Sequence, residues 1–82
     1  MNFATRVRLK KGKDKRLLLG HPWVYRVDID AVRGPAAPGD IVLVENHRGK
    51  PLGLGYYNPL SAIAVRLLTP NPEEAIDTAF FA

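Results

Sequence analysis

Apolar and polar residues alternate in short stretches along the chain, which is the pattern of half-buried β-strands. Val7 and Leu9 alternate with basic residues at the start, and residues 23–25 form a second short run of residues that favour strands. Three stronger stretches follow at 41–45, 52–57 and 62–68. Because these stretches are short and separated by turns, the pattern predicts a small β-barrel of five to six strands.

Two short helices are predicted in addition to the strands. The first covers 13–19, with Asp14 in its first turn and Gly20 as its C-terminal cap, and Pro22 prevents it from continuing. The second covers 73–81, directly after a proline. We therefore expect a fold that is mainly β with short helices (α+β), with one helix near the start and one at the C-terminus.

Glycine and proline mark the turns between these elements. Residues 33–40 contain two of each, and 46–50 are predicted to form a hairpin loop in which Gly49 adopts a positive φ. Gly53 and Gly55 alternate within a strand. This spacing predicts either the close approach of another backbone or the sharp coiling that closes a small barrel.

The overall composition is that of one ordered globular domain. Hydrophobic residues make up 46% of the 82 residues and charged residues 24%, so we expect 1–82 to form a single domain. The basic start of the chain is not followed by an apolar run long enough for a signal peptide or a membrane span. The absence of cysteine fits a reducing compartment. We expect a cytoplasmic protein that has no membrane partner.

Positive charge is concentrated at one end of the chain. The first sixteen residues contain seven basic side chains and one acidic side chain, Asp14, which gives a net charge of +6. The remaining residues contain five basic and seven acidic side chains, so the total is +4. Because solubility does not need such clustering, it favours a polyanion as partner over a merely solvated basic surface.

The sequence contains no arrangement of residues typical of a catalytic or metal site. Residues 53–55 resemble the start of a dinucleotide-binding loop, but the third glycine is missing and no helix follows. His21 and His47 lack the spacing of metal ligands, and the single serine has no evident base partner. We interpret Asp28 and Asp30 as solvated turn residues. We therefore expect no catalytic, cofactor-binding or metal-binding residue in this chain.

A basic stretch followed directly by planar side chains is typical of an RNA-binding surface, because cations neutralise phosphates and planar groups stack on unpaired bases. The cations here are Lys10, Lys11, Lys13 and Arg16, and the planar groups are His21, Trp23, Tyr25 and Arg26. For Trp23 we favour a core position beneath the first helix, since a lone tryptophan usually anchors a small core. Arg66 is expected either to be paired internally or to face a ligand. Tyr56 and Tyr57 should point to opposite faces, which places one of them in the core.

Several segments of the chain resemble a bacterial family of ribosomal RNA cytosine-C5 methyltransferases. They are 15–25 (KRLLLGHPWVY), 38–40 (PGD), 53–61 (GLGYYNPLS), 63–66 (IAVR) and 76–81 (IDTAFF). The Gly-His-Pro-Trp run and the Tyr-Asn-Pro-x-Ser run are together fairly specific. The likeness extends over nearly the whole chain.

This resemblance implies an N-terminal PUA domain, a pseudo-barrel with one prominent helix near its start. In that family the domain precedes a central α/β region and a Rossmann-like domain that binds S-adenosylmethionine. We therefore expect a fragment of a larger enzyme, with downstream domains of the same polypeptide as partners. The implied function is to bind ribosomal RNA and to present it to the distant catalytic site.

The RNA-binding residues expected from the charge pattern and from the resemblance form one set. They are Lys10, Lys11, Lys13, Arg16, His21, Trp23, Arg26, Tyr57, Asn58 and Arg66. Methylation at carbon 5 of a pyrimidine ordinarily needs a cysteine nucleophile, so we expect no enzyme activity from this chain by itself. S-adenosylmethionine is implied only for the full-length parent. The adjacent Phe80 and Phe81 motivate an alternative hypothesis, an architectural or protein-interaction domain that packs on its own enzyme.

Overall fold

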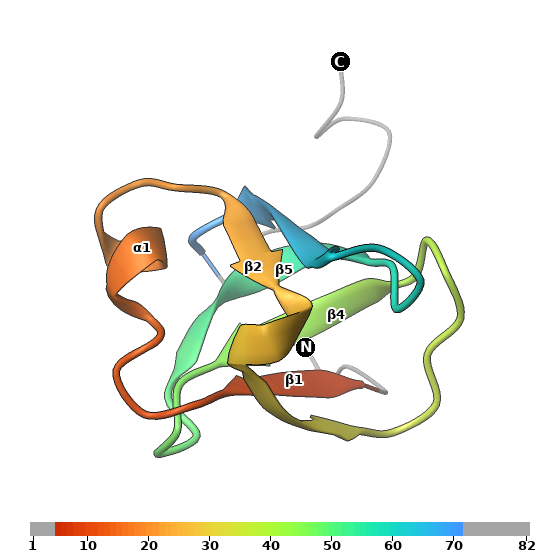
Figure 1. Cartoon of the computed structure of the whole chain (residues 1–82), viewed down its shortest axis with the longest axis horizontal. Helices are drawn as coiled ribbons and strands as arrows, with labels where there is room; N and C mark the ends of the chain where they lie inside the picture. The colour runs from red at the N-terminus through yellow and green to blue at the C-terminus, as the bar shows by residue number, and fades with distance from the viewer. Residues whose placement is uncertain (1–4, 72–82) are drawn as a thin grey trace.

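Six short strands pair into one sheet that curls around a central core (Figure 1). The structure is a computed structural model that describes residues 5–71. The strands are β1 (Arg6–Leu9), β2 (Trp23–Tyr25), β3 (Ile29–Arg33), β4 (Ile41–Glu45), β5 (Pro51–Tyr57) and β6 (Ile63–Thr69). The helical elements are α1 (Lys15–Leu18) and a 3-10 turn, η1 (Arg26–Asp28). The expected fold of mainly β structure is confirmed, with six strands in a half-barrel.

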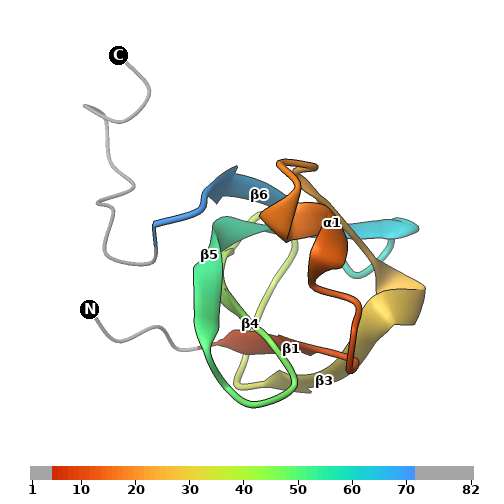
Figure 2. The same ribbon diagram turned by 90° about the vertical axis from the view of Figure 1, so that its left-hand side faces the viewer.

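The strand order explains how the sheet becomes a half-barrel. The order is β2-β6-β5-β4-β1-β3, and all neighbours are antiparallel except β1 and β4. The two edge strands, β2 and β3, follow each other in the chain and are joined only by η1. The sheet must therefore coil until its edges lie near each other, as the view in Figure 2 shows.

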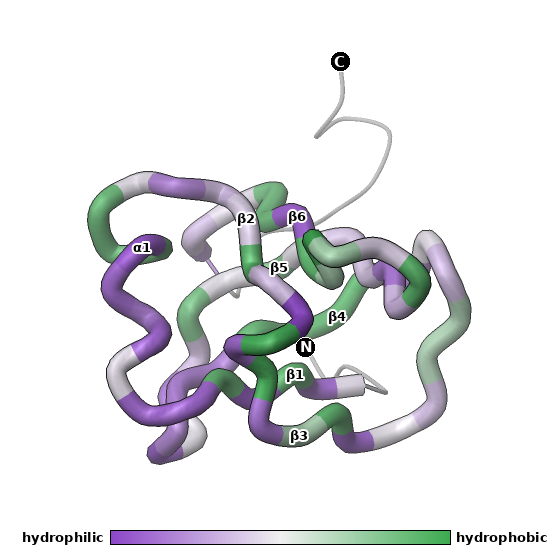
Figure 3. The backbone as a smooth tube through the Cα atoms, viewed as in Figure 1, coloured by the Kyte–Doolittle hydropathy of each residue, from purple (hydrophilic) through white to green (hydrophobic). Residues whose placement is uncertain are grey.

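The core is built almost entirely from valine and leucine side chains. Its buried cluster consists of Val7, Leu9, Val24, Val42, Val44 and Val65. In β1 the apolar residues point inward, while Arg6 is exposed and Arg8 is half-buried. In Figure 3 the stretch from the end of β1 to α1 is mostly hydrophilic. The predicted half-buried first strand is confirmed.

The two glycines of β5 allow β6 to approach closely. A Cβ atom at Gly55 would lie 2.6 Å from the carbonyl oxygen of Arg66 and 2.7 Å from Cγ1 of Val65. A Cβ atom at Gly53 would overlap the carbonyl oxygen of Thr69. The prediction of a close backbone approach is therefore confirmed. In the hairpin loop, Gly49 has the predicted positive φ, at 83°.

The helix near the start is much shorter than the predicted range 13–19. Only four residues, Lys15–Leu18, are helical. A turn in which the Lys13 amide donates to the Lys10 carbonyl oxygen precedes α1, and Gly12 in that turn has a φ of 80°. Asp14 and Leu19 cap α1, with ψ angles of −8° and 2° instead of the roughly −42° of an α-helix, so the helical range lies inside the predicted one. The prominent helix is thus a single turn, and the helix predicted over 73–81 lies outside the described residues.

Strand β3 is an element that the sequence pattern did not predict. Asp28 lies in η1, but Asp30 lies within β3, which pairs with β1 in antiparallel register. The interpretation of both aspartates as turn residues is therefore wrong for Asp30. Its side chain is tolerated because β3 is an edge strand with one exposed face.

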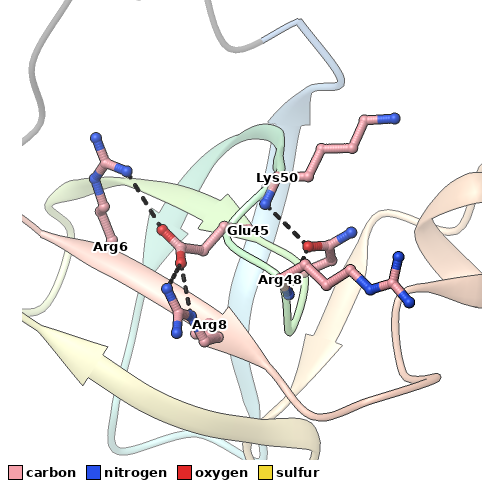
Figure 4. Close-up of polar contacts among 6 residues, drawn as sticks. Arg6, Arg8, Glu45, Arg48 and Lys50 are labelled. Atoms are coloured by element: carbon pink, nitrogen blue, oxygen red, sulfur yellow. Dashed lines mark hydrogen bonds and ion pairs between the residues drawn. The ribbon is translucent and has the colours of Figure 1, made fainter.

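A buried carboxylate joins β1 to the end of β4 (Figure 4). The Nε and Nη2 atoms of Arg8 both lie 2.7 Å from Oε2 of Glu45, whose side chain is only 1% exposed. Nη1 of Arg6 lies 3.6 Å from Oε1 of the same carboxylate. Arg8 is thus turned toward Glu45 and does not belong to a purely solvated basic face. This pair fixes the position at which β1 ends and the following basic loop begins.

Candidate nucleic-acid interface

A cavity of about 230 Å³ lies between α1 and β2. It is lined by Arg16, His21, Trp23 and Tyr25. Arg16 comes from α1, His21 from the loop that follows, and the two aromatic residues from β2. Strand alternation turns both aromatic residues outward, because Val24 between them is buried in the core. Each of the four lining side chains carries a planar group: a guanidinium, an imidazole, an indole or a phenol ring.

Arg16 is held across the face of an aromatic ring in this cavity. Its guanidinium carbon lies 4.9 Å from the ring centroid of Tyr25, a cation–π distance. This contact orders the side chain of an exposed arginine without using its N–H donors. The guanidinium can therefore still bind a phosphate or a base edge.

The structure contradicts the predicted core position of Trp23. Its side chain is 47% exposed, and the inward position of β2 is occupied by Val24. Residues 23 and 25 of this three-residue strand lie on the same side, so with Val24 in the core Trp23 is turned outward. The core is filled by valine and leucine and leaves no space that needs an indole.

Arg66 lies beside Trp23 on the outer face of the sheet. The two residues are Cα partners in the β2–β6 ladder, and Arg66 is exposed rather than buried in an internal ion pair. Tyr56 is its partner on the other side, is 38% exposed, and does not line the cavity. Tyr57 instead packs against the core, so the prediction that one of these tyrosines is a core residue is confirmed.

The predicted cations gather in one segment next to the cavity. Lys10, Lys11 and Lys13 are exposed in the β1–α1 loop, and Arg16 follows on α1. The Lys10 amide donates to the carbonyl oxygen of Asp28 at 2.8 Å, which holds the loop beside η1. Asp28 lines two hollows next to the cavity, and Asp14 is the N-cap of α1, so two negative charges accompany these four cations.

The remaining predicted residues make contacts within the fold. Nη1 of Arg26, an exposed side chain, lies 3.4 Å from the carbonyl oxygen of Pro59. Oδ1 of Asn58 accepts a hydrogen bond from the Leu60 backbone amide at 3.1 Å. The backbone amide of Asn58 donates to the carbonyl oxygen of Ala64. These contacts shape the β5–β6 turn. The RNA contacts expected of Arg26, Tyr57 and Asn58 stay predictions.

Two further cations that the sequence pattern did not single out lie in the β4–β5 hairpin. Arg48 and Lys50 are exposed, and their backbone amides both donate to Oδ1 of Asn46 at 2.9 Å (Figure 4). Since β4 runs parallel to β1 with Glu45 opposite Arg8, this hairpin begins where the basic β1–α1 loop also begins. Sequence reasoning missed these two cations because only the pairing of β1 with β4, two distant segments, brings them to the start of the basic loop.

Residues 5–71 show neither a candidate metal site nor a helix that could span a membrane. No three His, Asp or Glu side chains of that range are grouped in a way that could hold a metal ion. None of its helices is long and apolar enough to cross a membrane.

Comparison with known proteins gives three results. A family model described as a PUA-like domain matches residues 7–70. Ribosomal RNA large subunit methyltransferase I of Shigella boydii serotype 18 is 40% identical over 80 residues, which cover 98% of this chain and 20% of that protein. The protein of the same name from Escherichia coli strain K12 matches with the same identity and coverage. The chain thus spans about a fifth of the length of the curated relatives it matches.

A solved structure shares the fold. It is described as the crystal structure of a PUA domain from Aeropyrum pernix K1 in a tartrate complex. The TM-score is 0.72 at 20% sequence identity, and the match covers 89% of this chain and 46% of that chain. At this identity the likeness concerns the architecture of the barrel.

Proposed function

The chain belongs to the PUA-like domain family, and we propose on that basis that it is an RNA-binding module. The observation that supports this most strongly is the arrangement at one end of the barrel. There, three exposed lysines of the β1–α1 loop precede a cavity that is lined by a fourth cation, Arg16, and by three aromatic side chains. Cations that neutralise phosphates and planar groups that stack on bases are the two components of RNA recognition.

In this proposal the cations and the planar groups have different tasks. Lys10, Lys11, Lys13 and Arg16 bind phosphates, while His21 and Trp23 contact bases. The remaining members of the interface are Arg26, Tyr57, Asn58 and Arg66. Phosphate contacts give affinity and position the RNA, and contacts to unpaired bases give selectivity for RNA over duplex DNA.

We further propose that residues 1–82 act as one domain of a longer cytoplasmic ribosomal RNA methyltransferase. The support is the 40% identity to relatives named ribosomal RNA large subunit methyltransferase I. The domain would bind ribosomal RNA for a downstream domain that uses S-adenosylmethionine and methylates carbon 5 of cytosine. The methyl donor and the catalytic residues would belong to that other domain.

The experiment that tests RNA binding is a titration of the ¹⁵N-labelled chain with a ribosomal RNA hairpin and, separately, with duplex DNA. Saturable shifts of the amides between Lys10 and Arg26, stronger with RNA, are the expected result. Equal shifts spread over all basic residues with both nucleic acids would mean that the chain has only a basic surface. A folded chain whose spectrum does not respond to RNA would contradict the proposal.

A second candidate function is supported by one observation on α1. Leu18 and Leu19 are 70% and 79% exposed, which is unusual for adjacent leucines and suits a surface that another domain covers. In that case the module is architectural and packs on its own enzyme. Hydrogen exchange of the longer polypeptide distinguishes the two functions, because the architectural one requires protection of the whole basic segment around α1.

A further inference from the structure

The cavity between α1 and β2 differs in charge from the two hollows with which it shares Arg16. All three involve Arg16, but both neighbouring hollows include Asp28, whereas none of the four residues that line this cavity is acidic. A carboxylate repels phosphate and also competes for the guanidinium group. Among these three hollows, the cavity between α1 and β2 is therefore the one best suited to a nucleotide.

The size of the cavity limits what it can bind. Its volume of about 230 Å³ is below the roughly 300–1,000 Å³ of pockets for drug-sized ligands. A single heterocycle fits this description better than a dinucleotide or a large cofactor. The half-exposed indole of Trp23 and the imidazole of His21 both offer flat surfaces at its rim.

The β2–β6 register adds a cation next to the indole. Arg66 is the Cα partner of Trp23 and is exposed on the same ladder. A base that stacks on Trp23 would bring its phosphate near such a neighbour, while Arg16 stays ordered by Tyr25 on the other side of the cavity. One cation, Arg16, thus lines the cavity beside the aromatic side chains, and a second, Arg66, lies on the strand next to Trp23.

We propose that this cavity binds one unpaired nucleobase of RNA, with Trp23 as its stacking surface and with Arg16 and Arg66 as flanking cations. The inference rests on the proposed RNA-binding function and adds that the chain selects RNA with an extruded or unpaired nucleotide. Bases inside an A-form duplex are stacked on each other, so they cannot enter a cavity of this kind. Affinity should therefore depend on an unpaired base and not only on charge.

The test compares a blunt RNA duplex with the same duplex carrying one unpaired 2-aminopurine. Trp23 is the only tryptophan of the chain, so its fluorescence reports directly on the cavity. We expect the duplex with the unpaired base to bind about tenfold more tightly at equal salt, in line with one base–aromatic stack. Its binding should quench both the Trp23 and the 2-aminopurine emission, while the blunt duplex should leave Trp23 unchanged.

Variants assign the effect to the cavity. Trp23→Ala should lower the affinity for the unpaired-base RNA to that of the blunt duplex, and Trp23→Phe should keep most of the preference. Val32→Ala shortens a similarly exposed apolar side chain of β3 that lines neither the cavity nor the two hollows beside Arg16, so it should keep the full preference. Thermal unfolding of each variant shows that the comparison is made on folded protein.

The outcomes separate the inference from the function on which it rests. If both RNAs bind equally and Trp23→Ala changes neither affinity, the base cavity is wrong while RNA binding stands. If neither RNA binds to the folded chain, the proposed function fails and the inference fails with it. A preference for the unpaired base that Trp23→Ala removes and Val32→Ala keeps supports the inference.

Discussion

At the scale of single residues, the most constrained side chain is the carboxylate of Glu45. It is 1% exposed, and both hydrogen-bonding nitrogens of Arg8 are directed at its Oε2 atom. Burial of a charge costs free energy unless a partner compensates it, so this pair is stable only as a unit. Its position matters for the site, because β1 leads directly into the loop with Lys10, Lys11 and Lys13.

Substitution of the two arginines around Glu45 should have unequal effects on stability. Arg8→Ala leaves a buried carboxylate without its close partner and should lower the free energy of unfolding by about 3 kcal/mol. Arg6→Ala removes a half-exposed partner at 3.6 Å and should cost no more than about 1 kcal/mol. Urea unfolding of the two variants checks this. Equal losses would show that the short Arg8 contacts do not determine the stability.

At the scale of elements, the β5–β6 pair determines the curvature of the sheet. Gly53 and Gly55 leave no side chain between the two strands, so the backbone of β6 lies directly against them. The same pairing positions Arg66 between Tyr56 on β5 and Trp23 on β2. The position of Arg66 on the outer face of the site therefore depends on Gly53 and Gly55, which allow β5 and β6 to pair closely.

An alanine in β5 should disturb this pairing. Gly55 has an ordinary backbone conformation, so the cost of Gly55→Ala arises only from the contact of Cβ with Arg66 and Val65, and we expect a loss of about 1–3 kcal/mol. Gly39→Ala is a useful comparison, because its Cβ meets nothing within 4 Å and only its φ of 91° is unfavourable. Unfolding curves together with amide shifts of β5 and β6 provide the measurement. A Gly55→Ala variant with wild-type stability and unchanged shifts would show that the strands are not in close contact.

The sequence pattern predicted the elements whose signal is local. The apolar stretch of β4, the hairpin turn at Gly49 and the alternating glycines of β5 all carry their information within a few residues. Strand β3 was missed because Asp30 is typical of turns, and only the pairing with β1 makes it part of a sheet. The length of α1 was overestimated because the backbone angles of its caps, Asp14 and Leu19, are not visible in the sequence.

The same distinction applies to the candidate site. Its cations and planar residues are close in sequence, so their proximity in the structure was foreseeable. The outward position of Trp23 was not, because a three-residue strand gives no alternation from which the inward face can be deduced. Trp23 and Arg66 are neighbours only because β2 pairs with β6, which is distant in sequence, and no local pattern predicts that pairing.

At the scale of the whole molecule, charge is distributed unequally around the barrel. The net charge of +6 in the first sixteen residues lies mainly in the β1–α1 loop and on α1. Arg48 and Lys50 lie in the β4–β5 hairpin, which starts beside the same end of β1. Arg33, in contrast, pairs with Arg6 at the opposite end of that strand. A polyanion should therefore approach one end of the molecule preferentially.

The most direct test of this account is the salt dependence of RNA affinity for the wild type, Arg16→Ala and Arg33→Ala. Both variants lose one exposed arginine and the same charge, but only Arg16 belongs to the proposed interface. With three or four phosphate contacts, log affinity should fall with log salt at a slope of roughly −2 to −4. Arg16→Ala should weaken binding and make the slope shallower by about 1, while Arg33→Ala should match the wild type. Equal changes in both variants, or no binding by the folded chain, would contradict an RNA interface at α1 and β2.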